Sequence, residues 1–185
     1  AKVADIVYHE YGHAISFVFY RDNGSTFRNG GLGEAFSDIW GMLPTNDPLI
    51  GRGIRNRGGG LSRRYDRNPK VFPQDLTGEV HDNGEILAGA FWDMKKNLGS
   101  LNQMAQLFKA TYQALPNAME GNEGVLFRDV LVEVLTANDD DNDLSNGTPD
   151  QEAITTAFAK HGITLLAGVD LDHTPTKMRQ PNTTA

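Results

Sequence analysis

The feature that most constrains the fold and chemistry of this chain is the pentapeptide His9-Glu10-Tyr11-Gly12-His13. In an α-helix, residues four positions apart lie on the same face, so the imidazoles of His9 and His13 can reach one metal ion. Glu10 lies further round the helix, where its carboxylate suits a base beside the metal better than a ligand. The pattern is typical of zinc sites, although a helix with two unrelated histidines would produce it too.

A second pair of polar residues follows in residues 30–41, a glycine-rich turn that leads into an amphipathic segment. Glu34 and Asp38 are four residues apart and share a helix face. Two neutral imidazoles leave Zn²⁺ in need of another protein ligand, and a carboxylate from a second helix can supply it, so we predict Glu34 as the third ligand. Metal-bound histidines usually donate their other N–H to a carboxylate, and we expect Asp38 to accept it from His9. The alternative for this pair is a solvated acidic face.

The composition limits the classes of protein that remain. With 185 residues, of which 39% are hydrophobic, the chain suits one domain with a core of ordinary size. The net charge of -7 argues against nucleic-acid binding, and no apolar run approaches the length of a membrane span. Cysteine is absent from the chain, which excludes disulfides and thiol chemistry.

Hydrophobic periodicity predicts a mainly α-helical unit over residues 1–169 and a polar tail or linker over residues 170–185. In the first helix, Val7 and Val18 are among the apolar residues expected to be buried. Residues 44–80, rich in Gly, Pro and Arg, have no lasting periodicity and are expected to form a long irregular segment. The expected helices cover residues 3–20, 31–43, 84–98, 101–115 and 124–137, and a last helix runs from a capping box at Thr148 to about His161.

Together, the His9-Glu10-x-x-His13 and Gly33-Glu34-Ala35-x-Ser37-Asp38 motifs resemble the gluzincin metallopeptidases, in particular the thermolysin-like and fungalysin-like families. The resemblance covers residues 1 to about 100 and implies the helical C-terminal subdomain of a thermolysin-like zincin, from a protein that is secreted. The chain starts directly in the motif helix, without an N-cap residue. It therefore reads as part of a larger protease, and an upstream β-rich subdomain or propeptide of the same precursor is expected as a partner.

Residues 78–86 are similar to the segment that carries, in these families, a histidine directed at the scissile carbonyl. The resemblance gives that role to His81, whereas a histidine that only caps or packs near the next helix is the alternative. Asp82 is a possible residue to orient His81. Glu85, four residues after His81, is given no role.

The same families bind a substrate backbone carbonyl through an arginine, and the Gly53-Ile54-Arg55 context matches it best, so Arg55 is the expected substrate ligand. The other arginines of this segment are expected to form a solvated basic loop. Thermolysin-like enzymes also use a tyrosine donor that has no counterpart at residues 23–25. Tyr20 and Tyr65 are the residues that could replace it.

Residues 138–147 alternate carboxylates with short side chains, as calcium loops do. The segment lacks the central glycine and the closing glutamate of an EF-hand. If Ca²⁺ binds, Asp139, Asp141 and Asp143 are the expected ligands; a plain acidic turn before a capped helix is the alternative.

These patterns favour a zinc metalloendopeptidase that hydrolyses peptide or protein substrates with a metal-activated water, with Glu10 as general base and His81 as donor to the carbonyl oxygen. Two alternatives stay open. The chain could be a catalytically weak or inactive zinc-binding fragment that serves as a binding or scaffold module. It could also be an aminopeptidase, which would need an acidic group to hold the α-amine of its substrate.

Overall fold

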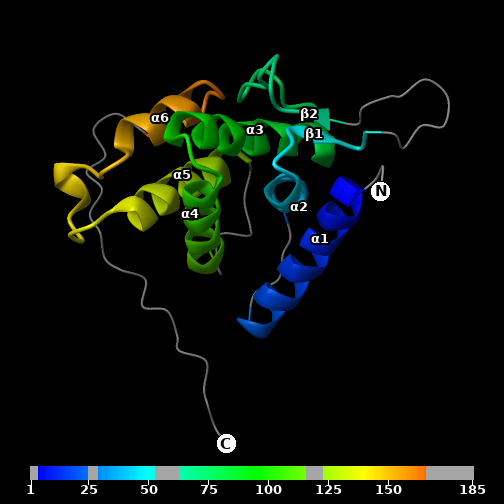
Figure 1. Ribbon diagram of the computed structural model, residues 1–185, viewed down its shortest axis with the longest axis horizontal. Helices are drawn as coiled ribbons and strands as arrows, with labels where there is room; N and C mark the ends of the chain where they lie inside the picture. The colour runs from blue at the N-terminus through cyan, green and yellow to red at the C-terminus, as the bar shows by residue number, and fades with distance from the viewer. Residues whose placement is uncertain (1–3, 25–28, 53–62, 116–122, 166–185) are drawn as a thin grey trace, which may run out of the picture.

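The computed structural model describes residues 4–24, 29–52, 63–115 and 123–165, and over these residues the chain is mainly α-helical, as predicted (Figure 1). The helices are α1 (Ala4–Asp22), α2 (Gly30–Thr45), α3 (Val80–Leu98), α4 (Leu101–Ala114), α5 (Glu123–Asn138) and α6 (Gln151–Ala159). The shorter elements are β1 (Leu49–Ile50), β2 (Arg63–Arg64) and the 3-10 turn η1 (Leu144–Asn146). None of the described helices combines the length and apolar character that crossing a membrane requires. The predicted tail, residues 170–185, lies outside the described residues.

Helix α2 is the central element, because α1 packs on one side of it and α3 on another (Figure 1). Its first turn is closed by the side chain of Asn29, which accepts a hydrogen bond of 2.8 Å from the backbone N–H of Leu32. Most of α2 is buried, and the buried residues include the carboxylates of Glu34 and Asp38. Since buried charges need partners, neighbouring elements have to supply them.

Two glycines let the flanking helices approach the backbone of α2 closely. A Cβ atom at Gly12 of α1 would lie 2.9 Å from Cα of Ser37, and one at Gly84 of α3 would lie 2.9 Å from the backbone nitrogen of Ala35. In a close-packed interior no side chain fits at such distances from backbone atoms. The metal-motif helix and the first turns of α3 are thereby held against the helix that carries Glu34.

The far end of α1 is anchored in an aromatic cluster. The hydroxyl of Tyr20 donates a hydrogen bond of 2.9 Å to the backbone carbonyl of Tyr112, and both rings are buried. The ring centroid of Phe36 lies 5.4 Å from that of Phe108 and 5.4 Å from that of Tyr112. Such edge and tilted arrangements stabilise aromatic cores and here join α1, α2 and α4.

The outer side of α1 differs from the prediction. Val7, Tyr11 and Val18 are 61%, 64% and 46% exposed, so the expectation that Val7 and Val18 are buried is wrong for the described residues. The helix contacts α2 through the opposite side, which carries His9, Gly12 and Ser16. The side of α1 that packs on α2 is mainly polar and small, whereas the apolar side chains of Val7, Tyr11 and Val18 lie on the exposed side.

The described residues between α2 and α3 are largely irregular, as predicted, apart from one short ladder. Leu49 pairs with Arg64 and Ile50 with Arg63 in a short antiparallel ladder of β1 and β2. Residues two apart in a strand share a face, so the ladder aims Arg63 and Tyr65 to the same side. Both side chains reach Asp38 of α2.

Two helix starts also differ from the expected positions. Helix α3 begins at Val80 rather than residue 84, because the side chain of Glu79 accepts a hydrogen bond from the backbone N–H of Asp82. Helix α6 begins at Gln151, because only half of the expected capping box forms: Gln151 Oε1 accepts from the backbone N–H of Thr148. The earlier start of α3 places His81 on a helix instead of in a loop.

We predict that Gly12→Ala destabilises the protein by about 1–2 kcal/mol, because overpacking against Ser37 outweighs the gain of about 1 kcal/mol in helix propensity. Thermal unfolding monitored by circular dichroism measures the change. Tyr11→Ala, at an exposed position of the same helix, is the control and should change stability by less than about 0.5 kcal/mol. A Gly12→Ala variant as stable as the wild type, or more so, contradicts the close contact of α1 with α2.

Candidate metal centre

Three side chains from two helices meet at one point. The Nε2 atoms of His9 and His13 lie 3.2 Å apart, and each faces the carboxylate of Glu34: His9 Nε2 is 3.2 Å from Oε2 and His13 Nε2 is 3.3 Å from Oε1. Nitrogen and oxygen ligand atoms of the three residues all lie within 4.8 Å of one another. The structure thus brings together the three residues that the sequence predicts as zinc ligands.

The spacing of these atoms is compatible with a tetrahedral cation. Oε2 of Glu34 is buried and accepts no well-formed hydrogen bond from the described residues, although imidazole nitrogens surround it. Zn–N distances of about 2.0–2.1 Å at tetrahedral angles separate neighbouring ligand atoms by about 3.3–3.4 Å, close to the observed spacings. Two imidazoles and one carboxylate are also a typical donor set of catalytic zinc sites with an open position.

Asp38 holds the outer side of this cluster. Its Oδ1 lies 2.6 Å from Nδ1 of His9, as predicted from the spacing of the two motifs. Arg63 donates from Nε to Oδ2 at 2.5 Å and from Nη2 to Oδ1 at 2.6 Å, and the hydroxyl of Tyr65 also donates to Oδ2. With donors on both oxygens, the buried carboxylate stays ionised and fixes the ring of His9 so that Nε2 points at Glu34 and His13.

The pKa values follow from these contacts. Burial by itself would raise the pKa of Asp38, but the hydrogen bonds from His9 and Arg63 keep it below its usual value. Burial likewise would raise the pKa of Glu34, whereas the two histidines lower it well below its usual range. For His9, burial lowers the pKa, yet the hydrogen bond to Asp38 and the nearby carboxylate of Glu34 outweigh it and raise the pKa to about 9. The carboxylates that hold this proton are suited to hold a metal cation in its place.

His81 reaches the same carboxylate from the first turn of α3. Its Nε2 atom lies 3.3 Å from Oε2 of Glu34, and Nδ1 lies 2.6 Å from Oε1 of Glu79. Glu79 therefore orients His81. Asp82, which the sequence suggested for this task, instead accepts a hydrogen bond from the hydroxyl of Thr77. The imidazole is about half exposed, so it borders the cluster and remains accessible to solvent.

Among the described residues, the other predicted ones lie outside the group of His9, His13, Glu34 and His81. Glu10 lies on an exposed position of α1, one residue after His9. Neither proposed tyrosine is a free donor at the cluster, because Tyr20 donates to the carbonyl of Tyr112 and Tyr65 to Asp38. Arg55 lies outside the described residues.

The acidic segment before α6 forms a second, separate cluster of carboxylates. Oxygens of Asp139, Asp140 and Asp141 lie within 4.8 Å of one another, whereas Asp143 caps η1 through hydrogen bonds from the backbone N–H and hydroxyl of Ser145. Calcium binding here stays a prediction. The carboxylates that lie close together are those of Asp139, Asp140 and Asp141, so Asp140 takes the place predicted for Asp143.

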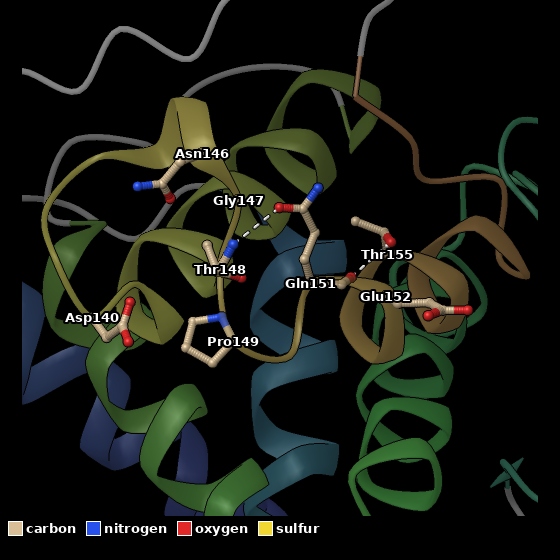
Figure 2. Close-up of a pocket in the computed structure, with 8 residues that line it drawn as sticks. All are labelled: Asp140, Asn146, Gly147, Thr148, Pro149, Gln151, Glu152 and Thr155. Carbon is tan, nitrogen blue, oxygen red and sulfur yellow. Dashed lines mark hydrogen bonds between the residues drawn. The ribbon is translucent and has the colours of Figure 1, made fainter.

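An open pocket of about 780 Å³ adjoins the acidic segment, on the α6 side of the molecule (Figure 2). Its lining comes from the loop before α6 and from α6 itself and consists of Asp140, Asn146, Gly147, Thr148, Pro149, Gln151, Glu152 and Thr155. None of the three predicted zinc ligands lines it. The pocket and the cluster of His9, His13 and Glu34 are therefore separate features of the structure.

Sequence reasoning missed Arg63 and Glu79. The arginine was assigned to a solvated basic loop, yet its side chain is only 8% exposed. The alternation Arg63-Arg64-Tyr65 carried the signal, because in a strand the first and third residues share a face, but a two-residue strand is too short to recognise from periodicity. Glu79 carried no comparable signal, because glutamate is not among the residues preferred as N-caps, although its carboxylate accepts from the backbone at the start of α3.

Comparisons of the chain with protein-family models, with curated proteins and with solved structures find no match. The assignment of the site consequently depends on the residues and their geometry alone.

We predict that Arg63→Ala weakens zinc binding about 10- to 100-fold, because Asp38 loses two charged donors and holds His9 less firmly. Competition with a chromogenic chelator measures the dissociation constant. Arg64→Ala is the matched control: the neighbouring side chain pairs with the exposed carboxylate of Asp66 at 2.6 Å and should leave zinc affinity within about twofold. Equal losses in the two variants contradict the role of Arg63.

Proposed function

We propose that the protein is a zinc-dependent endopeptidase of the gluzincin type, similar to the thermolysin-like and fungalysin-like families, and that the described helices form its helical C-terminal subdomain. One observation carries the proposal. His9, His13 and Glu34 converge with ligand atoms 3.2–3.3 Å apart, and His81 faces the same carboxylate. Glu10 follows the first of these residues on the same helix. A metal site with a neighbouring carboxylate and a neighbouring imidazole donor suits hydrolysis of a peptide bond.

The zinc ligands in this proposal are His9, His13 and Glu34, with Asp38 orienting His9. Bound there, Zn²⁺ would supply Lewis acidity toward a water molecule and the scissile carbonyl. Glu10 accepts the proton of the attacking water and delivers it to the leaving amine.

His81 stabilises the negative charge that grows on the carbonyl oxygen, by donating from Nε2. Glu79, whose Oε1 lies 2.6 Å from Nδ1, limits the rotation of the imidazole and leaves Nε2 directed at the cluster. Since the charge on the carbonyl oxygen develops only in the transition state, this hydrogen bond lowers the barrier more than it strengthens substrate binding.

The exposed apolar side of α1 supports the expected partner. Val7, Tyr11 and Val18 follow one another at helical spacing and are largely exposed, while the opposite side of the helix packs on α2. Exposed apolar residues that cluster on one helix side are typical of a surface that another part of a protein covers. We propose that a β-rich subdomain or propeptide covers this face and forms the second wall of the substrate cleft.

We predict that Glu10→Gln retains zinc but lowers the rate of peptide cleavage about 10²- to 10⁴-fold, because the general base is lost. His81→Ala should lower kcat about 10²- to 10³-fold through loss of the donor to the carbonyl oxygen. Cleavage of an internally quenched peptide, at equal zinc occupancy, measures both. The rate should rise when the β-rich subdomain is supplied, since misplacement of a substrate by about 1 Å can cost roughly a hundredfold.

Glu152→Gln, an exposed carboxylate on α6, serves as the control and should cleave at the wild-type rate. A Glu10→Gln variant with undiminished activity would show that the base is assigned wrongly. If the zinc-loaded wild type cleaves no peptide with or without the β-rich subdomain, the chain is a non-catalytic zinc protein.

A further inference from the structure

Glu85 is a carboxyl group beside the metal cluster that the proposed mechanism does not use. It lies on α3 one turn after His81, so both side chains leave the same face of the helix. Between them, Gly84 brings the α3 backbone against Glu34, where a Cβ would lie 2.9 Å from that of the glutamate. Glu85 therefore lies one helical turn from His81, the residue proposed to face the scissile carbonyl.

No residue of the described part of the chain makes a hydrogen bond or ion pair with Glu85, although two cations lie near it. Arg63 directs its Nε and Nη2 donors to Asp38 and is not available. Lys70 affects Glu85 only through its charge, and its backbone carbonyl faces the ring of His161. The half-buried carboxylate of Glu85 can therefore accept hydrogen bonds from a group outside the chain.

The surrounding charges agree with this. Burial raises the pKa of Glu85 to about 7; Lys70 and Arg63 oppose the increase, and Asp82 and Asp38 add to it. The charged and titratable groups that interact electrostatically with Glu85 come from several elements: Asp38 on α2, Arg63 and Tyr65 around β2, Lys70 in the following segment and Asp82 on α3. Because the carboxylate form is under-compensated, a positive group placed against it would be stabilised.

We propose that Glu85 binds a cationic amino group of the substrate next to the scissile bond. This inference rests on the proposed peptidase function and adds a substrate class to it. The amino group has two possible sources with the same chemistry, a lysine side chain or the α-amine of a substrate that is cleaved near its N-terminus. The second source corresponds to the acidic group that an aminopeptidase requires.

The test uses the zinc-loaded Glu10→Gln chain, which should bind peptides without cleaving them, and calorimetry with two pairs of short peptides. One pair is acetylated and differs by lysine or norleucine at a single position. The other carries norleucine and differs by a free or acetylated N-terminus. In at least one pair the cationic peptide should bind about tenfold more tightly than its neutral partner, and the pair that shows the preference identifies the source.

Adding Glu85→Gln should abolish the preference, whereas adding Glu152→Gln should preserve it. Zinc affinity and the unfolding midpoint verify that each variant is folded. Absence of a preference for either cationic peptide, or a preference that survives Glu85→Gln, overturns the inference while the peptidase proposal stands if the wild type cleaves peptides. If no peptide binds and the wild type cleaves none, both proposals fail.

Discussion

The close contact of α1 and α3 with the backbone of α2 is the constraint on which the rest of the structure depends. Gly12 and Gly84 lie where a single methyl group would come within 2.9 Å of α2 atoms. The contact places two histidines on one side of Glu34 and His81 on another, at distances of 3.2–3.3 Å. A larger side chain at either glycine would move the helices apart and lengthen these distances, because the close-packed interior has no space for it.

Electrostatics then make this packing self-consistent. Glu34 and Asp38 are buried carboxylates, and each would be costly without partners. Asp38 is hydrogen-bonded to His9 of α1, to Arg63 of β2 and to Tyr65, the residue after β2. The position of His9 therefore depends on the segment between α2 and α3 as well as on its own helix. Glu34 faces imidazole nitrogens that suit a shared cation. The two carboxylates thus have different tasks, which their different neighbours determine.

Much of this arrangement could be predicted from the sequence, since the spacing of four residues within each motif fixes which side chains share a helix face. His9, His13, Glu34 and the contact of Asp38 with His9 follow from it. The roles of Arg63 and Glu79 could not, because they arise from a two-residue strand and a helix cap whose positions tertiary contacts decide. Val7 and Val18 were misjudged for a related reason: periodicity reveals that a face is apolar but not which neighbour covers it.

The measurement that tests the central claim most directly is X-ray absorption spectroscopy at the zinc edge of the purified, zinc-loaded chain. The account predicts one zinc with two imidazole nitrogens at about 2.0–2.1 Å and a carboxylate oxygen in its coordination sphere, and loss of this signature in a His9→Ala, His13→Ala variant. Zinc surrounded only by oxygen atoms, as the carboxylates of Asp139, Asp140 and Asp141 would provide, would contradict the assignment of the metal centre.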